Sequence, residues 1–216
     1  MSTTNIEFLG HPTHGGWHAD SSHLNPKSIV YAFGVGDDIT WDLALIEKYG
    51  CTIHAFDPDP HSNAWLAKQE IPPQLIFRAE GIAAYDGTQR FYDPYNKNNI
   101  SMSTIRKNRT FSDLPVKRLQ TFMHELGHDH IDLLKMDIEG SEYAVIPDIL
   151  KLDIRQILVE LHPRFFRGWK GFRRVYGWLK TKIIFWEFKH ANFIIVHVRG
   201  QDYTFIRNKN FQEAKS

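Results

Sequence analysis

The stretch Ser28-Ile-Val-Tyr-Ala-Phe-Gly-Val-Gly-Asp-Asp38 decides the fold. Its first six residues form a short apolar run that ends in glycines, which is typical of a buried parallel strand leading into a turn. We predict a helix over Thr40 to Lys48, begun by Asp38 or Thr40 and ended by Gly50. A second strand is predicted over Cys51 to Phe56. This succession indicates a βαβ unit with a right-handed crossover.

The rest of the chain continues the alternation of strands and helices. Further helices are predicted over Ser62 to Glu70, in the residues before Gly127, and over Ile146 to Leu152. Further parallel strands are predicted over Leu75 to Arg78, Ile131 to Met136 and Gln156 to Leu161.

Two turn signals predict antiparallel hairpins. Asp86-Gly87-Thr88 lies between Ile82 to Tyr85 and Arg90 to Tyr92. Near the end of the chain, Gly200-Gln-Asp202 lies between Phe193 to Val198 and Tyr203 to Arg207. Five parallel strands with helical crossovers and a closing antiparallel pair indicate a doubly wound α/β fold, which binds ligands at the carboxyl ends of its strands.

The composition indicates one globular domain. The chain has 216 residues, enough to bury one large core, and no Pro/Gly/Ser-rich linker divides it. Apolar residues make up 42% and charged residues 24%, which argues against a disordered or fibrous chain. No export signal is visible, and no window approaches the roughly 18 apolar residues that span a bilayer. Cys51 is the only cysteine, so we expect a reducing, cytoplasmic setting and no cysteine-based metal cluster.

The net charge of +1 is unevenly distributed. Residues 1–160 hold 14 basic and 22 acidic side chains, whereas residues 161–216 hold 12 basic and 3 acidic ones. A basic aromatic segment over 164–190 could meet an anionic partner such as nucleic acid. We favour the simpler interpretation, in which one or two helices pack their aromatic side chains inward while the cations stay in solvent.

The glycine turn favours a nucleotide-like cofactor. Gly36 and Asp57 stand 21 positions apart, a spacing that allows an acidic side chain to grip ribose hydroxyls. A dinucleotide site needs a third glycine where this chain has Ile39. Asp37 and Asp38 would also meet a pyrophosphate with negative charge at the start of the helix. A cationic sulfonium cofactor without phosphate fits the turn better.

The strand ending in Leu134-Lys-Met-Asp-Ile-Glu-Gly-Ser-Glu142 runs directly into three carboxylates. Asp137 and Glu139 are expected where this fold places its chemistry, beside the first glycine turn. For Glu142 we favour a structural role, pairing with the dipole at the start of a helix.

Three stretches resemble the FkbM-type family of S-adenosylmethionine-dependent methyltransferases. They are Gly15-Gly-Trp17, the segment from Tyr31 to Asp42 running into His54-Ala-Phe-Asp-Pro58, and Leu134 to Glu142, which is the most diagnostic. With the intervening strands they cover most of the chain up to about His162, and the resemblance thins beyond it.

The resemblance implies a seven-stranded class I methyltransferase fold, S-adenosylmethionine as cofactor, and methyl transfer to a hydroxyl of a saccharide or related small molecule. The alternative is a nucleic-acid-binding or RNA-modifying methyltransferase that uses the basic C-terminal third of the chain. The residues expected to bind the cofactor are Trp17, Phe33, Gly34, Gly36, Asp42, Asp57, Pro58, Gly81 and Asp137. Residues 1–27 are expected to form an N-terminal cap segment. The loop over 93–113 is expected to cover the site, with Ser101, Ser103 and Arg106 touching the acceptor.

A hydroxyl is a weak nucleophile, so a base within hydrogen-bond reach should take its proton. Asp137, Glu139 and His162 are the candidates. The pKa of an unperturbed histidine, about 6.5, suits a base at neutral pH. The alternative for His162 is a structural role beside Pro163. We predict no metal ligands, although a divalent cation held by Asp137 and a neighbouring carboxylate stays open.

His124-Glu-Leu-Gly-His128 satisfies the H-E-x-x-H pattern of zinc proteases. That chemistry needs both histidines one turn apart on a continuous helix, with the glutamate activating a zinc-bound water. Gly127 follows the apolar positions of a predicted helix and is expected to end it. We therefore predict that His124, His128 and His130 form a solvated helix end and turn, and keep a zinc hydrolase as the weaker alternative.

Overall fold

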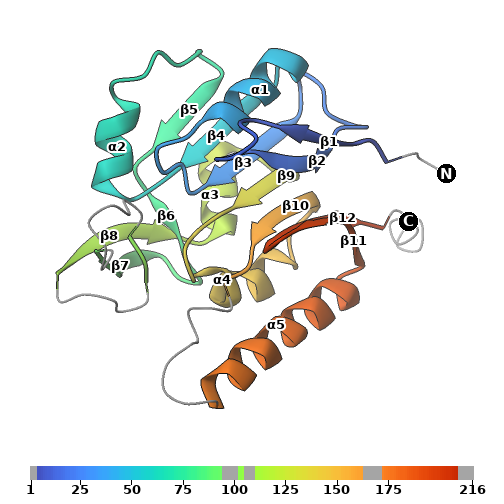
Figure 1. The fold of residues 1–216 in the computed structure, drawn as a ribbon. Helices are drawn as coiled ribbons and strands as arrows, with labels where there is room; N and C mark the ends of the chain where they lie inside the picture. The colour runs from blue at the N-terminus through green and yellow to red at the C-terminus, as the bar shows by residue number, and fades with distance from the viewer. Residues whose placement is uncertain (1–3, 94–101, 105–109, 163–171, 209–216) are drawn as a thin grey trace.

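The computed structural model describes residues 4–93, 102–104, 110–162 and 172–208. A seven-stranded sheet in the order β11-β12-β10-β9-β3-β4-β5 runs through the molecule (Figure 1). The parallel strands are β3 (Ile29–Phe33), β4 (Thr52–Phe56), β5 (Leu75–Arg78), β9 (Ile131–Met136) and β10 (Ile154–Glu160). An antiparallel hairpin of β11 (Phe193–Arg199) and β12 (Asp202–Arg207) closes the sheet beside β10. The predicted doubly wound sheet with a closing hairpin is confirmed.

Helices cover both faces of this sheet. One core contains side chains of α1 (Thr40–Tyr49), α2 (Pro60–Leu66) and the hairpin of β1 (Ile6–Leu9) and β2 (Trp17–Asp20), which lies within the predicted cap segment. The other contains side chains of α3 (Leu119–Leu126), α4 (Glu142–Ile149) and α5 (Phe172–His190). None of the helices in the described residues is long and apolar enough to cross a membrane.

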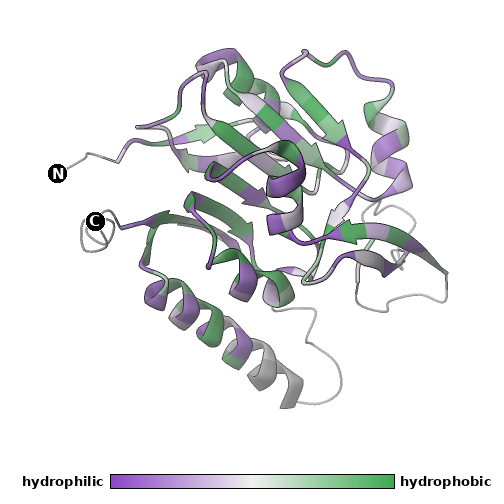
Figure 2. Ribbon diagram, turned by 180° about the vertical axis from the view of Figure 1, so that it is seen from behind, coloured by the Kyte–Doolittle hydropathy of each residue, from purple (hydrophilic) through white to green (hydrophobic). Residues whose placement is uncertain are grey.

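The strand sequences explain why there are two cores. Successive side chains of a strand point to opposite faces, so in β3 Val30 and Ala32 enter one core while Tyr31 and Phe33 enter the other. All four are at most 2% exposed. Figure 2 shows apolar residues running along the strands of the central sheet. Burying a large apolar side chain stabilises the fold by about 1.5–3 kcal/mol, so this apolar run fixes β3 in the middle of the sheet.

Several predicted helix boundaries are confirmed, whereas those of α2 and α4 are wrong. The helix predicted over Ser62 to Glu70 is α2, which begins at Pro60 and ends at Leu66. Gly50 and Gly127 take left-handed conformations, with φ of 66° and 71°, and end α1 and α3 as expected. The side chain of Asp38 accepts a hydrogen bond of 2.7 Å from the N–H of Thr40 at the start of α1. Helix α4, however, begins at Glu142 instead of Ile146 and contains Pro147. Its buried side chains pack into the core, which outweighs the hydrogen bond that the proline cannot make.

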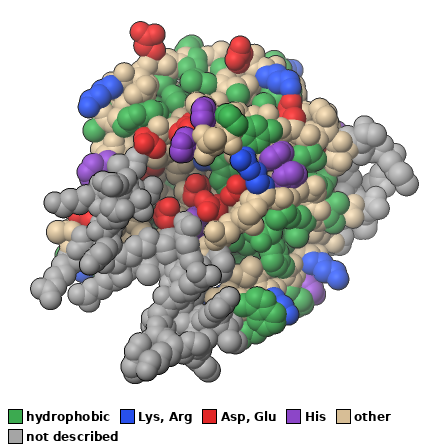
Figure 3. All heavy atoms as spheres, in the orientation of Figure 1, with side chains coloured by type: hydrophobic (Ala, Val, Ile, Leu, Met, Phe, Trp, Pro, Cys, Tyr) green, Lys and Arg blue, Asp and Glu red, His purple; other side chains and the backbone are tan. Residues whose placement is uncertain are grey.

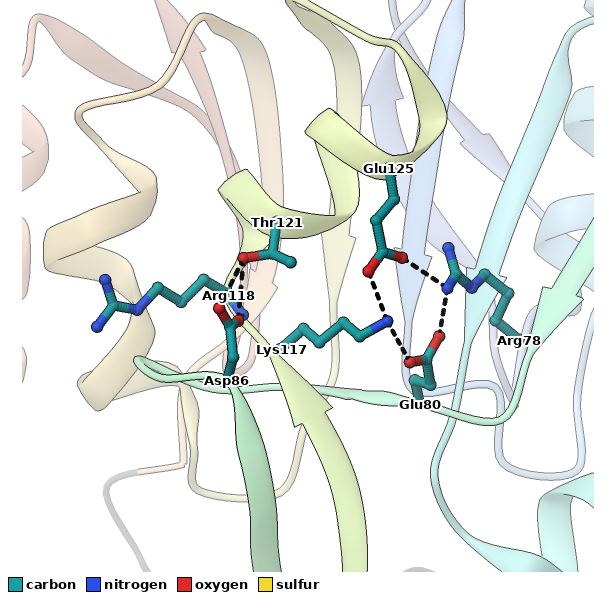
Figure 4. Close-up of polar contacts among 7 residues, drawn as sticks. All are labelled: Arg78, Glu80, Asp86, Lys117, Arg118, Thr121 and Glu125. Atoms are coloured by element: carbon teal, nitrogen blue, oxygen red, sulfur yellow. Dashed lines mark hydrogen bonds and ion pairs between the residues drawn. The ribbon is translucent and has the colours of Figure 1, made fainter.

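The hairpin predicted around Asp86-Gly87-Thr88 is wrong. Strand β7 (Gly87–Tyr92) instead pairs antiparallel with β8 (Phe111–Lys117), which also pairs with the short β6 (Gly81–Ile82). This three-stranded sheet projects from one side of the molecule (Figure 1). The loop predicted over 93–113 therefore ends in a strand at Phe111. The side chain of Asp86 accepts hydrogen bonds from the N–H of Arg118 and the hydroxyl of Thr121, at the start of α3 (Figure 4).

The basic aromatic segment is described from residue 172, and its side chains from residue 177. Ile184 and Phe188 of α5 are buried, whereas Trp178 and Trp186 are 55% and 59% exposed. The ammonium of Lys182 lies 3.6 Å from the centre of the Trp178 ring. A surface helix buries only one stripe of side chains, so the prediction of inward-packed aromatics is confirmed for Phe188 and wrong for the two tryptophans.

The order of the parallel strands locates the site. From β3 the chain adds β4 and β5 on one side, then returns to add β9 and β10 on the other. The order thus reverses between β3 and β9, and in such sheets ligands bind at the carboxyl ends of the strands beside this point.

Candidate active site

The turn after β3 is tightly built around its glycines. Gly34 has a φ of 84°, and a Cβ on it would lie 1.8 Å from the carbonyl oxygen of Asp137. The N–H of Gly34 donates to Phe56 at 3.0 Å, and the N–H of Asp137 donates to Phe33 at 3.0 Å. Gly36 has a φ of 59°, but a Cβ there would meet nothing within 4 Å. The first glycine therefore allows close packing of strand ends, while the second faces open space.

Asp57, at the end of β4, holds this turn. Its Oδ2 accepts hydrogen bonds from the N–H groups of Val35 and Gly36, both at 2.9 Å, and its Oδ1 accepts one from Asp59 at 2.9 Å. The side chain is 6% exposed. Burial raises the pKa of Asp57, and the hydrogen bonds from Gly36, Asp59 and the Ser62 hydroxyl offset part of the rise. Its carboxylate thus links the ends of β3 and β4.

A cavity of about 260 Å³ opens at these strand ends. The predicted site residues that line it are Trp17, Phe33, Gly34, Gly36, Asp57, Pro58, Gly81, Asp137 and Glu139. They come from β2, from the last residue of β3, from the turns after β3, β4 and β9, and from β6. The structure therefore brings together residues that are up to 122 positions apart (17 to 139) in the sequence.

Three other predicted residues lie outside the lining of this cavity. Asp42 is 3% exposed in α1, and burial raises its pKa to about 6. Ser103 is buried, and its hydroxyl donates to the carbonyl of Glu139 at 2.9 Å. His162 is fully buried beside the acidic residues described below. Ser101 and Arg106 lie outside the described residues.

Sequence reasoning missed Lys135 and Asp59, which both line the cavity. The ammonium of Lys135 donates to the carbonyl of Gly34 at 3.1 Å and lies 5.4 Å from the centre of the Trp17 ring. A lysine within a predicted buried strand was the available signal, because lysine is seldom buried without a partner. Asp59 accepts a hydrogen bond of 3.1 Å from the N–H of Met102, a pairing that no local pattern reveals.

Acidic side chains gather in a hollow of the surface, with histidine and basic side chains beside it (Figure 3). At the ends of β9 and β10, the imidazole Nδ1 of His162 lies 2.8 Å from Oε1 of Glu142. Its Nε2 lies 3.3 Å from Glu160 and 3.9 Å from Glu139. Burial alone would lower the pKa of His162, but these three carboxylates outweigh it and raise the pKa. Glu142 also accepts a hydrogen bond of 3.2 Å from the N–H of Gly140. This residue therefore lies at the start of α4, as expected, and also pairs with His162.

The H-E-x-x-H match does not form a zinc site. Helix α3 ends at Leu126, so the two histidines do not share a continuous helix. Glu125 is held in ion pairs of 2.7 Å with Arg78 and Lys117, which also pair with Glu80 (Figure 4). His124 and His130 are exposed, as predicted. His128 is half-buried, and its Nδ1 lies 2.9 Å from the hydroxyl of Tyr31, so the prediction of full solvation is wrong for this residue.

Comparison with known proteins adds independent findings. Residues 28–205 match the family model described as the methyltransferase FkbM domain. The chain is 25% identical to a human protein named probable methyltransferase-like protein 24, over 91% of this chain and 52% of the relative. The rat protein of that name is 24% identical over 78% of this chain and 42% of its own length. A Streptomyces tacrolimicus protein named 31-O-demethyl-FK506 methyltransferase FkbM is 26% identical over 64% of this chain and 67% of its own length. The chain thus spans about half the length of the human and rat relatives.

Proposed function

The chain belongs to the methyltransferase FkbM domain family, and we propose that it transfers a methyl group from S-adenosylmethionine to a hydroxyl oxygen of a saccharide or related small molecule. The observation that carries this proposal is the cavity at the reversal point of the sheet, lined by Gly34, Gly36, Asp57 and Asp137. The name of the Streptomyces relative describes an O-demethyl substrate, which supports oxygen as the acceptor atom.

The lining of the cavity fits a cofactor without phosphates. Ile39 is 5% exposed and packed in the core where a dinucleotide site has its third glycine. Asp37 and Asp38 line the cavity just before α1, where they repel a pyrophosphate. The open space beside Gly36 lets a ligand approach the backbone closely. S-adenosylmethionine carries no phosphate and supplies an electrophilic methyl group on a sulfonium, whose positive charge suits these carboxylates.

Asp57 acts first by shaping the turn. A carboxylate has about four acceptor positions, and the N–H groups of Val35, Gly36 and Asp59 and the hydroxyl of Ser62 all donate to this one. Removing this side chain leaves two buried or half-buried N–H groups of the turn without their acceptor. We propose that Asp57 holds the glycine turn in its binding shape and that the same carboxylate faces the ribose hydroxyls of the cofactor.

The reaction balances as an in-line displacement. A lone pair of the acceptor hydroxyl forms a bond to the methyl carbon, the carbon–sulfur bond breaks, and its electron pair returns to sulfur. The hydroxyl proton passes to a base. Asp137 and Glu139 line the cavity, so we propose that one of these two carboxylates takes the proton. His162 is buried behind them, and we propose that it positions the carboxylates instead of meeting the acceptor.

Calorimetry with S-adenosylhomocysteine, the demethylated product, tests the cofactor assignment. We expect saturable binding with one site per chain, and a loss of binding in Asp57→Ala. The matched control is Asp113→Asn, which removes an exposed carboxylate that pairs with Arg90. Absence of binding by the unmodified chain would overturn the proposal. Once binding is established, a panel of saccharide acceptors can be screened by mass spectrometry for the gain of a methyl group.

A further inference from the structure

We propose that a divalent metal cation binds between Asp137, Glu160 and His162, at the carboxyl ends of β9 and β10. Each residue offers one ligand atom, and these atoms all lie within 4.8 Å of one another. Two ligand atoms on opposite sides of a cation stand about 4.2 Å apart, because each bond to a transition metal or magnesium measures about 2.1 Å. At most one pair among three ligand atoms can stand opposite each other, and adjacent ligand atoms of an octahedral cation stand about 3.0 Å apart. Side-chain rotations must therefore bring the three ligand atoms closer together when the cation binds.

The kinds of ligand define the kind of metal. Carboxylate oxygens suit magnesium and manganese, and an imidazole nitrogen extends the range to iron and zinc. The residues belong to the ends of two adjacent strands and the turn after β10, so the sheet itself sets their spacing. We therefore infer a site for a small divalent cation, with manganese as the practical probe.

The orientation of His162 is independent support. A metal-bound histidine almost always donates its other ring N–H to a carboxylate, a backbone carbonyl or a water molecule, which fixes the ring and its tautomer. Here Nδ1 of His162 lies 2.8 Å from Oε1 of Glu142, and both side chains are fully buried. The ring therefore turns its Nε2 toward Glu160, the second proposed ligand, at 3.3 Å.

Glu142 adds a further argument. Its Oε2 is buried and has no hydrogen-bond partner among the described residues. A buried carboxylate is costly unless a positive charge stabilises it. A cation on Nε2 of His162 would draw electron density from the ring and strengthen the hydrogen bond that Nδ1 donates to Glu142. The metal and the buried carboxylate thus stabilise each other through the imidazole.

Neighbouring charges also favour a cation at this place. Asp202, at the start of β12, is half-buried, and its carboxylate lies close enough to Asp137 for the two negative charges to repel each other. Glu139 lies on the same side of His162 as Glu160. Its φ of 48° is uncommon for a residue with a side chain, and such strained conformations cluster at functional sites.

A metal at this position would give Asp137 and Glu139 different roles at the cavity. This assignment rests on the proposed function. Asp137 would hold the metal, which would bind the acceptor hydroxyl and lower its pKa. Glu139, which also lines the cavity, would then take the proton. This goes beyond the expectation from the sequence, where a cation at Asp137 was left open.

Manganese titration of the chelator-treated full chain tests the site, with calorimetry for affinity and electron paramagnetic resonance for free Mn²⁺. We expect one Mn²⁺ per chain and a loss of affinity of about tenfold or more in Glu160→Gln and in His162→Asn. The matched control is His130→Asn. His130 also lies beside two carboxylates, Asp129 at 2.6 Å and Asp132 at 3.6 Å, but on the exposed surface.

The site would be disproved by a lack of saturable binding, or by binding that Glu160→Gln leaves unchanged. Glu160→Gln preserves the size of a partly exposed side chain, so it keeps the test valid even if His162→Asn fails to fold. S-adenosylhomocysteine binding is measured separately without metal. Product binding without Mn²⁺ binding refutes only the metal site, and Mn²⁺ binding without product binding refutes only the proposed cofactor.

Discussion

Gly34 and Asp137 approach each other so closely that a Cβ on Gly34 would lie 1.8 Å from the Asp137 carbonyl oxygen. The two residues end neighbouring strands at the reversal point of the sheet, where the cavity opens. Their contact sets how closely the first turn and the acidic turn can meet. The two glycines of the first turn therefore have different roles. Gly34 allows the two turns to pack closely, and Gly36 leaves space for a ligand.

Alanine at each glycine should separate these roles. Gly34→Ala combines a backbone clash with a left-handed alanine, so we expect its free energy of unfolding to fall by about 3 kcal/mol or more. Gly36→Ala meets no neighbouring atom and should lose only about 1 kcal/mol, while its methyl group enters the space for the cofactor and weakens product binding about tenfold. Urea unfolding and calorimetry measure the two effects. Equal destabilisation by both variants would contradict this division.

Asp42→Asn tests whether this residue is structural. Burial raises the pKa of Asp42 from 3.8 to about 6, so the native state binds more protons than the unfolded state between these pH values. Its stability therefore falls as pH rises through this window. We expect the variant to match the parent at pH 4 and to exceed its free energy of unfolding by up to about 3 kcal/mol at pH 8.

Product binding should be unchanged in Asp42→Asn, because Asp42 does not line the cavity. Asp113→Asn, at an exposed site, is the control for loss of a carboxylate. A loss of product affinity confined to Asp42→Asn would return this residue to the cofactor site, where the sequence resemblance placed it.

The fold was predictable where the chain signals are local. The apolar run before Gly34 predicted β3, and the glycines at positions 50 and 127 predicted where α1 and α3 end. The pairing of β7 with β8 was not predictable, because their paired residues lie up to 29 positions apart (87 to 116) and Asp86-Gly87-Thr88 has the composition of a local hairpin turn.

The sequence predicted which strand ends form the candidate site, but not the contacts between the side chains there. Asp137 and His162 were both expected at the site, because each follows a predicted parallel strand. The partner of His162 was not, since the contact with Glu142 depends on α4 beginning four residues earlier than predicted. Lys135 carried a usable signal, since it is a cation inside a strand predicted to be buried. The hydrogen bond between Asp59 and Met102, in contrast, depends on how a distant segment folds back.

The ion-pair network of Arg78, Glu80, Lys117 and Glu125 connects β5, β8 and α3 (Figure 4). Glu125→Gln removes one of its two carboxylates, and we expect a loss of about 1 kcal/mol at low salt that shrinks in high salt. Product binding should not change. Lys151→Gln, which removes an isolated exposed pair with Asp148, is the control and should have a smaller effect. A variant that loses bound zinc instead of stability would revive the hydrolase alternative.

His54 should make the fold sensitive to acid. Burial, followed by the charges of His128 and Arg78, lowers its pKa from 6.5 to about 4. The unfolded state therefore binds more protons than the native state between these pH values, and stability falls as pH falls through them, by up to about 3 kcal/mol. In His54→Asn this part of the pH dependence should vanish, as measured by urea unfolding of variant and parent at each pH.

The comparison with the parent is essential, since Asp42 contributes an opposite slope between about pH 4 and 6. His124→Asn, at an exposed position, should keep the slope of the parent. An unchanged slope in His54→Asn would show that the acid sensitivity arises elsewhere.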